Sequence, residues 1–170
     1  MVVDENLSKD HQVAGFFIKR ILPSGTKLLV VDKQANMLDN HANKALKTPK
    51  GSQSDTLMAL TAAIVKLGLA KNKTSVSASE LHDLAEKTGL STDDYLDAAF
   101  VIASSENPVI VYKDGSALTQ LKTLADLINA KLVCLKGSAN SLAASQLKLE
   151  ASLQSSGKQV VFVCTGDEEL

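Results

Sequence analysis

Polar residues follow most of the apolar, strand-like runs of this sequence, at the point where each run ends. Carboxylates in such positions accept hydrogen bonds, so they suit a ligand with ring N–H groups or ribose hydroxyls. In a parallel sheet the carboxyl ends of the strands share one edge, and ligands bind there, near the point where the strand order reverses. The candidate groups are Asp4-Glu5-Asn6 with His11, Asp32, the run 48–55, Asp114-Gly115 and the run 136–140.

Asp32 raises the main question, because it ends the apolar run LLVVD and no glycine-rich phosphate loop stands upstream of it. Two interpretations are open. Its carboxylate accepts hydrogen bonds from a ligand, or it caps the turn that follows the strand.

These groups do not form a catalytic set. A nucleophilic mechanism needs Ser or Cys within reach of His, and His11, His41 and His82 have no paired acid at a suitable spacing. His82 stands among polar residues and is expected to be exposed, and His11 is expected to lie outside the cleft. The two cysteines, Cys134 and Cys164, lie inside apolar runs and are expected to be buried thiols. We therefore expect no catalytic residues, no zinc site and no iron–sulfur site in this chain.

Strand-like and helix-like segments alternate along the chain. Strands are predicted at 1–4, 26–32, 44–48, 108–112, 131–135 and 159–164, and helices at 8–21, 55–69, 78–87, 92–104, 118–130 and 139–149. This alternation predicts an α/β fold, a three-layer αβα sandwich with a doubly wound, mainly parallel sheet of about five to six strands. Buried parallel strands are apolar on both faces. The following residues are therefore expected in the core: Leu29, Val31, Val109, Val111, Leu132, Val133, Val161 and Val163.

Composition limits the class of protein. A chain of 170 residues is expected to form a single Rossmann-like domain over 1–170. Its net charge of −1, with scattered lysines, argues against nucleic-acid binding. Its apolar runs are too short to span a bilayer, and its N-terminus does not read as a secretory signal. We expect a protein of the cytoplasm, at most peripheral to a membrane complex through other subunits.

The order of short motifs resembles the third domain of the molybdopterin oxidoreductases, the superfamily of formate dehydrogenases, nitrate reductases and the large iron–sulfur subunit of complex I. Six segments carry the resemblance in order: ENLSKDHQV, LLVVDKQ, TPKGSQSDTLMAL, EKTGLSTDD, PVIVYKDG and KGSANSLAA. Each motif is weak alone, but together they cover essentially the whole chain.

The resemblance implies a binding site for the nucleotide end of a molybdopterin guanine dinucleotide in the parent enzyme. By the resemblance, the cofactor-binding residues are Asn6, Asp32, Gly51, Ser54, Asp55, Gly137 and Asn140. The chain departs from the family pattern where D-P-R becomes Asp32-Lys33-Gln34, P-G-T-D becomes 51–55, and the glycine after PVIVY becomes Lys113. Fewer glycines leave less room for a dinucleotide at the backbone, so the site looks partly dismantled.

Three interpretations follow. The chain is a structural or vestigial domain of a larger oxidoreductase subunit, of the formate dehydrogenase or NADH–quinone oxidoreductase type, inactive in isolation. Alternatively it is a working cofactor-binding domain of such an enzyme, or a free-standing α/β nucleotide-binding or regulatory protein. The first two imply other domains of the same subunit, and respiratory-complex subunits, as partners. No metal or cofactor is expected on the isolated chain.

Overall fold

The computed structural model describes residues 1–3, 7, 9, 11–113, 115–136 and 146–147. By its contacts the chain divides into two units, Met1–Gly137 and Ser138–Leu170. Everything below concerns the first unit; in the second, only residues 146 and 147 are described, and both are exposed. The helix predicted at 139–149 and the strand predicted at 159–164, with Val161, Val163 and Cys164, lie outside the described residues.

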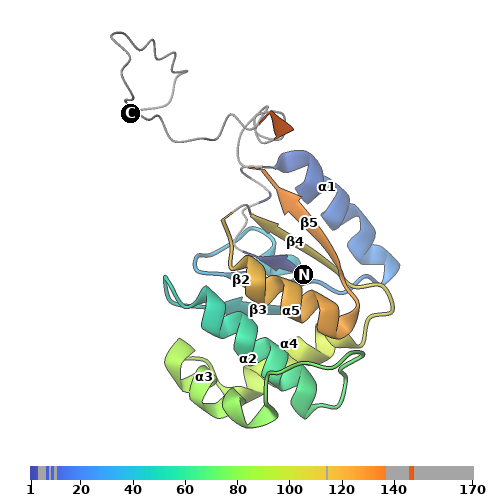
Figure 1. Ribbon diagram of the computed structural model, residues 1–170. Coiled ribbons are helices and arrows are strands. Elements are labelled where there is room, and N and C mark those ends of the chain that lie inside the picture. Colours follow the sequence, from blue (N-terminus) through green and yellow to red (C-terminus); the bar gives the residue numbers. More distant parts are fainter. Residues whose placement is uncertain (4–6, 8, 10, 114, 137–145, 148–170) are drawn as a thin grey trace, which may run out of the picture. The chain divides into compact units, whose positions relative to one another are not determined.

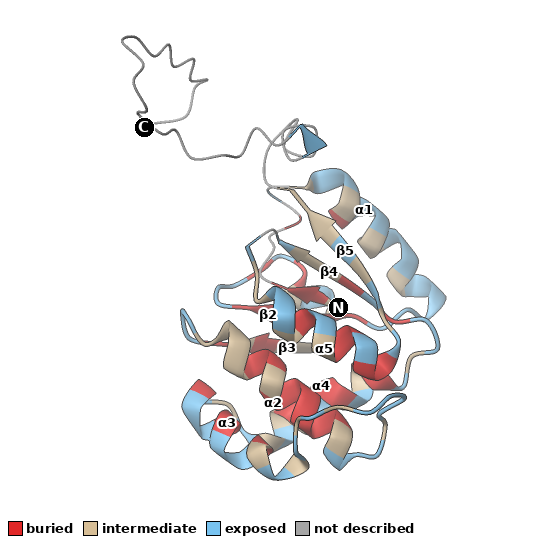
Figure 2. Ribbon diagram, in the orientation of Figure 1, coloured by how far each residue is buried: buried red, intermediate tan, exposed pale blue. Residues whose placement is uncertain are grey.

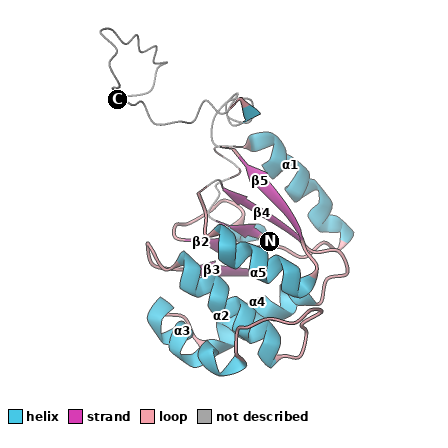
Figure 3. Cartoon of the chain, in the orientation of Figure 1, coloured by secondary structure: helices cyan, strands magenta, loops and turns pink. Residues whose placement is uncertain are grey.

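A parallel sheet forms the centre of the first unit (Figures 1 and 3). Its strands are β1 (Val2–Val3), β2 (Leu29–Asp32), β3 (Lys44–Lys47), β4 (Val109–Lys113) and β5 (Lys131–Leu135), in the order β3-β2-β1-β4-β5. Every described pairing is parallel. The chain therefore builds outwards from β1 in one direction and from β4 in the other, which makes the β1–β4 boundary the switch point of a doubly wound fold. The predicted fold class is confirmed.

Helices lie on both faces of this sheet. They are α1 (Gln12–Ile21), α2 (Gln53–Lys66), α3 (Leu81–Thr88), α4 (Thr92–Ala103) and α5 (Leu118–Ile128), with 3-10 turns at Leu22–Ser24, Asp39–His41 and Ala78–Glu80. Helices α2, α4 and α5 pack with Val3, Val31 and Ile110 in the larger hydrophobic cluster. Helix α1 lies over the opposite face, where Val2, Leu28 and Val30 form the smaller cluster. Helix α2 is the most deeply buried helix (Figure 2).

Local sequence signals account for the helix ends. Ser91 caps α4 and forms a reciprocal capping box with Asp94, as the acids and hydroxyl in this turn predict. Gly89 ends α3 in the left-handed region, at φ 69°. Helix α1 packs closely, because a Cβ on Gly15 would lie 3.1 Å from the carbonyl oxygen of Leu7. The expected Ser8 cap of α1 lies outside the described residues.

The expectation that the core strands are buried on both faces is only partly correct. Leu29 and Val31 of β2 are buried, at 1% and 2% exposure. Val111 and Leu132 are only half-buried, and Val109 and Val133 are 40% and 41% exposed. Val109, Val111 and Val133 share the face of Val2, where α1 packs over β1 and β2 and the described elements cover β4 and β5 incompletely. Leu132 lies on the other face with Ile110, where the larger cluster covers it only in part.

Helix α1 itself turns large apolar side chains outwards. Val13, Phe16 and Phe17 are 71%, 59% and 55% exposed. The residues on its inner face are smaller or narrower, chiefly Ala14, Gly15 and Ile18. The helical spacing of the apolar residues predicts the helix correctly, but the more hydrophobic stripe does not face the sheet. Within the described residues, no helix is long and apolar enough to cross a membrane.

Candidate functional site

A cavity of about 310 Å³ opens at the carboxyl ends of β2 and β3, next to the loop that follows β4. Three segments form it: the end of β2 with Lys33, the run from Thr48 into the first turn of α2, and Gly115 with Ala117. These segments are far apart in sequence, and they meet because parallel strands present their carboxyl ends at one edge. The cavity lies where the sequence predicts a ligand.

The start of α2 forms one wall of this cavity. Gly51 precedes the helix with φ 92°, a left-handed conformation that glycine adopts without strain. The N-cap residue is Ser52, and its side chain makes no capping hydrogen bond, because Oγ donates to the carbonyl oxygen of Pro49 at 2.7 Å. The first-turn N–H groups of a helix carry partial positive charge and bind anions. This wall can therefore accept a phosphate group.

Two buried polar atoms without a hydrogen-bond partner belong to Gln53, which lines the cavity, and to Ser116, which stands in sequence between the lining residues Gly115 and Ala117. Gln53 accepts a hydrogen bond from the backbone N–H of Ala117 through Oε1, at 3.3 Å, which ties α2 to the loop after β4. The Nε2 atom of the same side chain is buried without an acceptor, and Ser116 Oγ is buried without a partner. A buried donor with no acceptor costs about 1–3 kcal/mol. A ligand oxygen would relieve that cost, if Gln53 turned towards it.

Charge around the cavity is positive on its exposed rim. Lys33 and Lys50 are both exposed lining residues, and they stand on the two loops that follow β2 and β3. Asp32 supplies the opposing negative charge, and it is 9% exposed. The rim therefore attracts an anion, while a ligand that reaches the floor meets a carboxylate.

Asp32 braces its own loop. Its Oδ1 accepts a hydrogen bond from the backbone N–H of Gln34 at 3.1 Å, and its Oδ2 accepts one from Asn36 Nδ2 at 3.1 Å. Lys47 on β3 holds the same loop from outside, since Nζ lies 2.8 Å from both Asp39 Oδ1 and the Gln34 carbonyl oxygen. The interpretation of Asp32 as a cap for the turn that follows is therefore the one that the contacts support. Each oxygen keeps a lone pair for a ligand.

The structure brings together only part of the predicted site. Asp32, Gly51 and Ser54 line the cavity. Asp55 does not; it lies half-buried in the first turn of α2. Burial raises the pKa of Tyr95, its hydrogen bond with Thr88 opposes this, and the charge of Asp55 adds a smaller upward contribution. Asn6, Gly137 and Asn140 lie outside the described residues.

In the sequence, Gln53 stands out only as a change from the family pattern, and nothing marks Ser116 or Ala117. The signal for Gln53 is its position directly before an apolar helix, where a long amide can reach a neighbouring loop. No sequence signal marks the contact with Ala117, because the two residues are 64 positions apart. His82 is exposed, as predicted. Among the described residues, no group of three or more His, Cys, Asp or Glu side chains could hold a metal ion.

Comparisons with known proteins agree with this architecture. No protein-family model matches the chain. The alpha subunit of F420-dependent formate dehydrogenase 2 from Methanococcus maripaludis is 27% identical over 125 residues, which cover 66% of this chain and 18% of that protein. The structure of acetylene hydratase from Pelobacter acetylenicus matches with a TM-score of 0.56 and 19% identity, over 75% of this chain and 20% of that one.

The structural likeness to acetylene hydratase shows the fold. The match to the formate dehydrogenase subunit, added to the order of motifs, supports a relationship with the molybdopterin oxidoreductases. The chain spans about a fifth of the length of both proteins.

Proposed function

We propose that this chain is a cofactor-binding domain of a molybdopterin-dependent oxidoreductase, and that the cavity beside α2 holds phosphate groups of the cofactor's guanine dinucleotide. The domain performs no chemistry alone. Its own residues bind and orient one end of the cofactor, while the reacting end belongs to other parts of the enzyme. The relationship with formate dehydrogenase supports the cofactor class, and the cavity supports the phosphate end.

One observation carries this proposal. The cavity combines the uncapped start of α2 with Lys33 and Lys50 on its rim, at the carboxyl edge of a doubly wound parallel sheet. Helix N-termini and lysines both stabilise phosphate oxygens. Gln53 Nε2 adds a buried donor that lacks an acceptor. This donor set suits a diphosphate better than it suits a sugar or a base.

The size of the cavity limits what it can hold. Pockets for small ligands usually measure about 300–1,000 Å³, so a cavity of about 310 Å³ accepts only part of a dinucleotide. The remaining surface of the cofactor must be enclosed by other domains or subunits. For the isolated chain we therefore expect a dissociation constant of about 1 mM for GDP, which corresponds to about −4 kcal/mol.

A second candidate function is a purely structural domain that has kept the fold and lost the cofactor. Two observations favour it. Asp32 uses both carboxylate oxygens within its own loop, and Asp55 is absent from the residues that line the cavity. Under this interpretation the anion-binding features at the start of α2 remain from an ancestor that bound the cofactor. A free-standing nucleotide-binding protein, by contrast, would need an affinity far tighter than 1 mM.

Two lysines at opposite ends of α2 allow a matched test. Lys50 lines the cavity before the helix, and Lys66 is exposed in its last turn. GDP and inorganic diphosphate are titrated into the wild-type chain, Lys50→Gln and Lys66→Gln at low salt. We expect Lys50→Gln to weaken both ligands about two- to fivefold, as loss of one partly exposed charge does, and Lys66→Gln to change neither.

The outcomes separate the candidates. Equal affinity of guanosine and GDP would contradict a phosphate site. Absence of binding at 10 mM GDP by all three proteins would favour the structural domain. Micromolar binding of GDP to the wild-type chain would favour a free-standing nucleotide-binding protein.

A further inference from the structure

The described helices cover one face of the β4–β5 half of the sheet and leave the other face partly open. On the covered face, α5 packs with Ile110 in the larger cluster. On the open face, Val111 and Leu135 touch only the margin of the α1 cluster. Val133 is paired with Val111 and stands two residues before Leu135, so it shares their face, and it is 41% exposed. These three side chains form an apolar strip across both strands.

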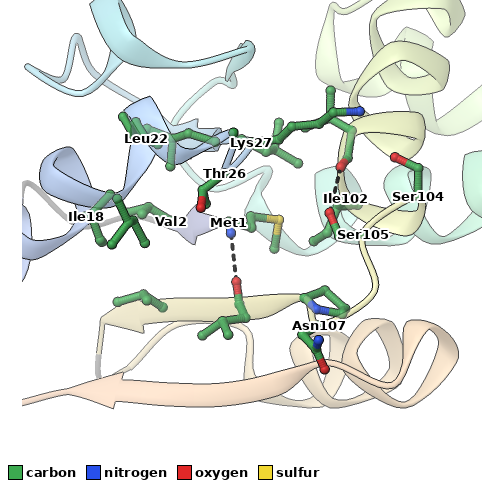
Figure 4. Close-up of a pocket in the computed structure, with 18 of the residues that line it drawn as sticks. Met1, Val2, Ile18, Leu22, Thr26, Lys27, Ile102, Ser104, Ser105 and Asn107 are labelled. Carbon is green, nitrogen blue, oxygen red and sulfur yellow. Dashed lines mark hydrogen bonds between the residues drawn. The ribbon is translucent and has the colours of Figure 1, made fainter.

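Helix α1 borders this strip with an apolar flank. Val13, Phe17 and Ile21 recur at every fourth position, so they lie along one side of the helix. They are 71%, 55% and 47% exposed. The flank is separate from the inner side of α1, where Ile18 packs with Val2 of β1 (Figure 4).

The flank is turned towards the open half of the sheet. Ile21 lines one cavity together with Val111 of β4, which puts this side of α1 next to β4. A right-handed connection from β1 through α1 to β2 requires the same orientation. The strip on β4 and β5 and the flank of α1 therefore form two sides of one apolar surface.

This surface has the dimensions of a seat for one helix. Packed helices lie about 8–10 Å apart, and two strand spacings also make about 10 Å. A helix in contact with α1, which covers β1 and β2, would therefore lie over β4 and β5. Strand β5 has five residues, and a strand of that length measures about 17 Å, as does a helix of about 11 residues.

The elements that border the seat are basic. Helix α1 and strands β4 and β5 carry Lys19, Arg20, Lys113 and Lys131 and no Asp or Glu, although the whole chain has a net charge of −1. Lys113 and Lys131 are exposed at opposite ends of the apolar strip, each two residues from a strip residue and so on the same face. Such a rim attracts a partner with acidic edges and disfavours a basic one.

We propose that the open face of β4 and β5, with the adjoining flank of α1, is a docking surface for an acidic amphipathic helix from a protein segment outside residues 1–170. The docked helix is apolar on the side that meets Val133 and Phe17, and acidic along its edges, where it meets the basic rim. It extends the helix layer of α1 over this half of the sheet. The cavity beside α2 shares no residue with this surface, so the inference is independent of the proposed function.

The probe is the peptide acetyl-Glu-Leu-Ala-Glu-Leu-Leu-Glu-Glu-Leu-Ala-Glu-Leu-Leu-Glu-amide, which has a leucine stripe and acidic edges when helical. Its control carries Lys in place of every Glu. Both peptides are titrated into the isotope-labelled chain and followed by NMR. We expect the glutamate peptide to shift the backbone amides of Phe17, Ile21 and Val133 with a dissociation constant of about 0.1 mM. The lysine peptide should bind about tenfold more weakly.

Two phenylalanines with equal exposure give a matched pair of variants. Phe17 on α1 and Phe100 on α4 are both 55% exposed, and only Phe17 belongs to the seat. Phe17→Ser should weaken binding of the glutamate peptide about fivefold, and Phe100→Ser should leave it unchanged. Lys131→Glu gives a second readout, since it should weaken the glutamate peptide and strengthen the lysine peptide about threefold each.

Several results would overturn the proposal. Equal binding of the two peptides, shifts at other positions only, or unchanged binding by Phe17→Ser would each do so. A dimer of the free chain that Phe17→Ser dissociates, measured by analytical ultracentrifugation, would assign the surface to a second copy. Binding to phosphatidylglycerol vesicles that Phe17→Ser abolishes, without a response to either peptide, would assign it to a membrane. Nuclear Overhauser effects between Val133 and residues 138–170 would assign it to the chain's own segment.

Discussion

Asn36 Nδ2 lies 3.1 Å from Asp32 Oδ2, so the acid at the end of β2 is bonded to a buried amide four residues further along its own loop. The other oxygen of Asp32 accepts the N–H of Gln34. An acid in this position therefore has a structural task that is independent of any ligand. The loop that it braces carries Lys33 to the rim of the cavity.

Replacing Asp32 should lower stability. We expect Asp32→Ala to reduce the free energy of unfolding by about 1–3 kcal/mol, because two donors lose their acceptor and one of them, the Asn36 amide, is buried. Asp32→Asn keeps one acceptor oxygen and should cost less. Urea denaturation of the two variants measures this order. An unchanged midpoint in Asp32→Ala, with GDP binding abolished, would instead assign Asp32 to the ligand.

The two halves of the sheet differ in burial, so truncating a strand side chain should cost different amounts of stability in each half. Leu29 on β2 is 1% exposed and Val133 on β5 is 41% exposed. Leu29→Ala should therefore cost about 2–5 kcal/mol, through lost contacts and a residual cavity. Val133→Ala should cost well under about 1 kcal/mol. Similar losses in the two variants, measured by thermal or chemical unfolding, would mean that β5 is covered in solution.

This contrast shows what the sequence could and could not predict. Runs such as LLVVD and KLVCL predict the strands, because only β-branched and aliphatic residues in short runs suit a parallel sheet. The same runs do not reveal how far helices cover each face. That depends on where α1 packs, which follows from contacts such as those of Gly15 with Leu7 and not from periodicity. The exposure of Val109 and Val133 was therefore predicted wrongly.

For the candidate site, too, the sequence could predict one part and not the other. The position of the cavity could be predicted, because the carboxyl ends of parallel strands are the binding edge of doubly wound folds. The roles of individual side chains could not. Asp32 and Asp55 both stand at the expected positions in sequence, yet one braces a loop and the other does not line the cavity. The tie between Gln53 and Ala117 depends on tertiary packing across 64 positions.

The amino group of Met1 should make stability depend on pH. Its pKa is lowered from 8.0 to about 5 in the folded chain, because burial disfavours the charged form. Between pH 5 and 8 the unfolded chain therefore binds more protons, and the free energy of unfolding should rise with pH across that range. The pKa difference corresponds to about 4 kcal/mol. Solvent contact at this half-buried residue reduces the expected rise to about 1–2 kcal/mol.

Acetylation of the Met1 amino group isolates this effect. The acetylated chain keeps one N–H for Val109 but has no charge to titrate. We expect the free energy of unfolding of the unacetylated chain to rise, relative to that of the acetylated chain, from pH 5 to pH 8. A difference that is constant across this range would show that the Met1 amino group titrates alike in the folded and unfolded chain.

The central claim is that the cavity beside α2 binds the phosphate end of a guanine nucleotide. Titration of isotope-labelled chain with GDP, followed by NMR to 10 mM ligand, tests it most directly. The account predicts shifts confined to the backbone amides of Lys33, Thr48, 50–54 and 115–117, with a dissociation constant of about 1 mM and a matching response to inorganic diphosphate. Shifts at other positions only, or no shifts at 10 mM GDP, would contradict it.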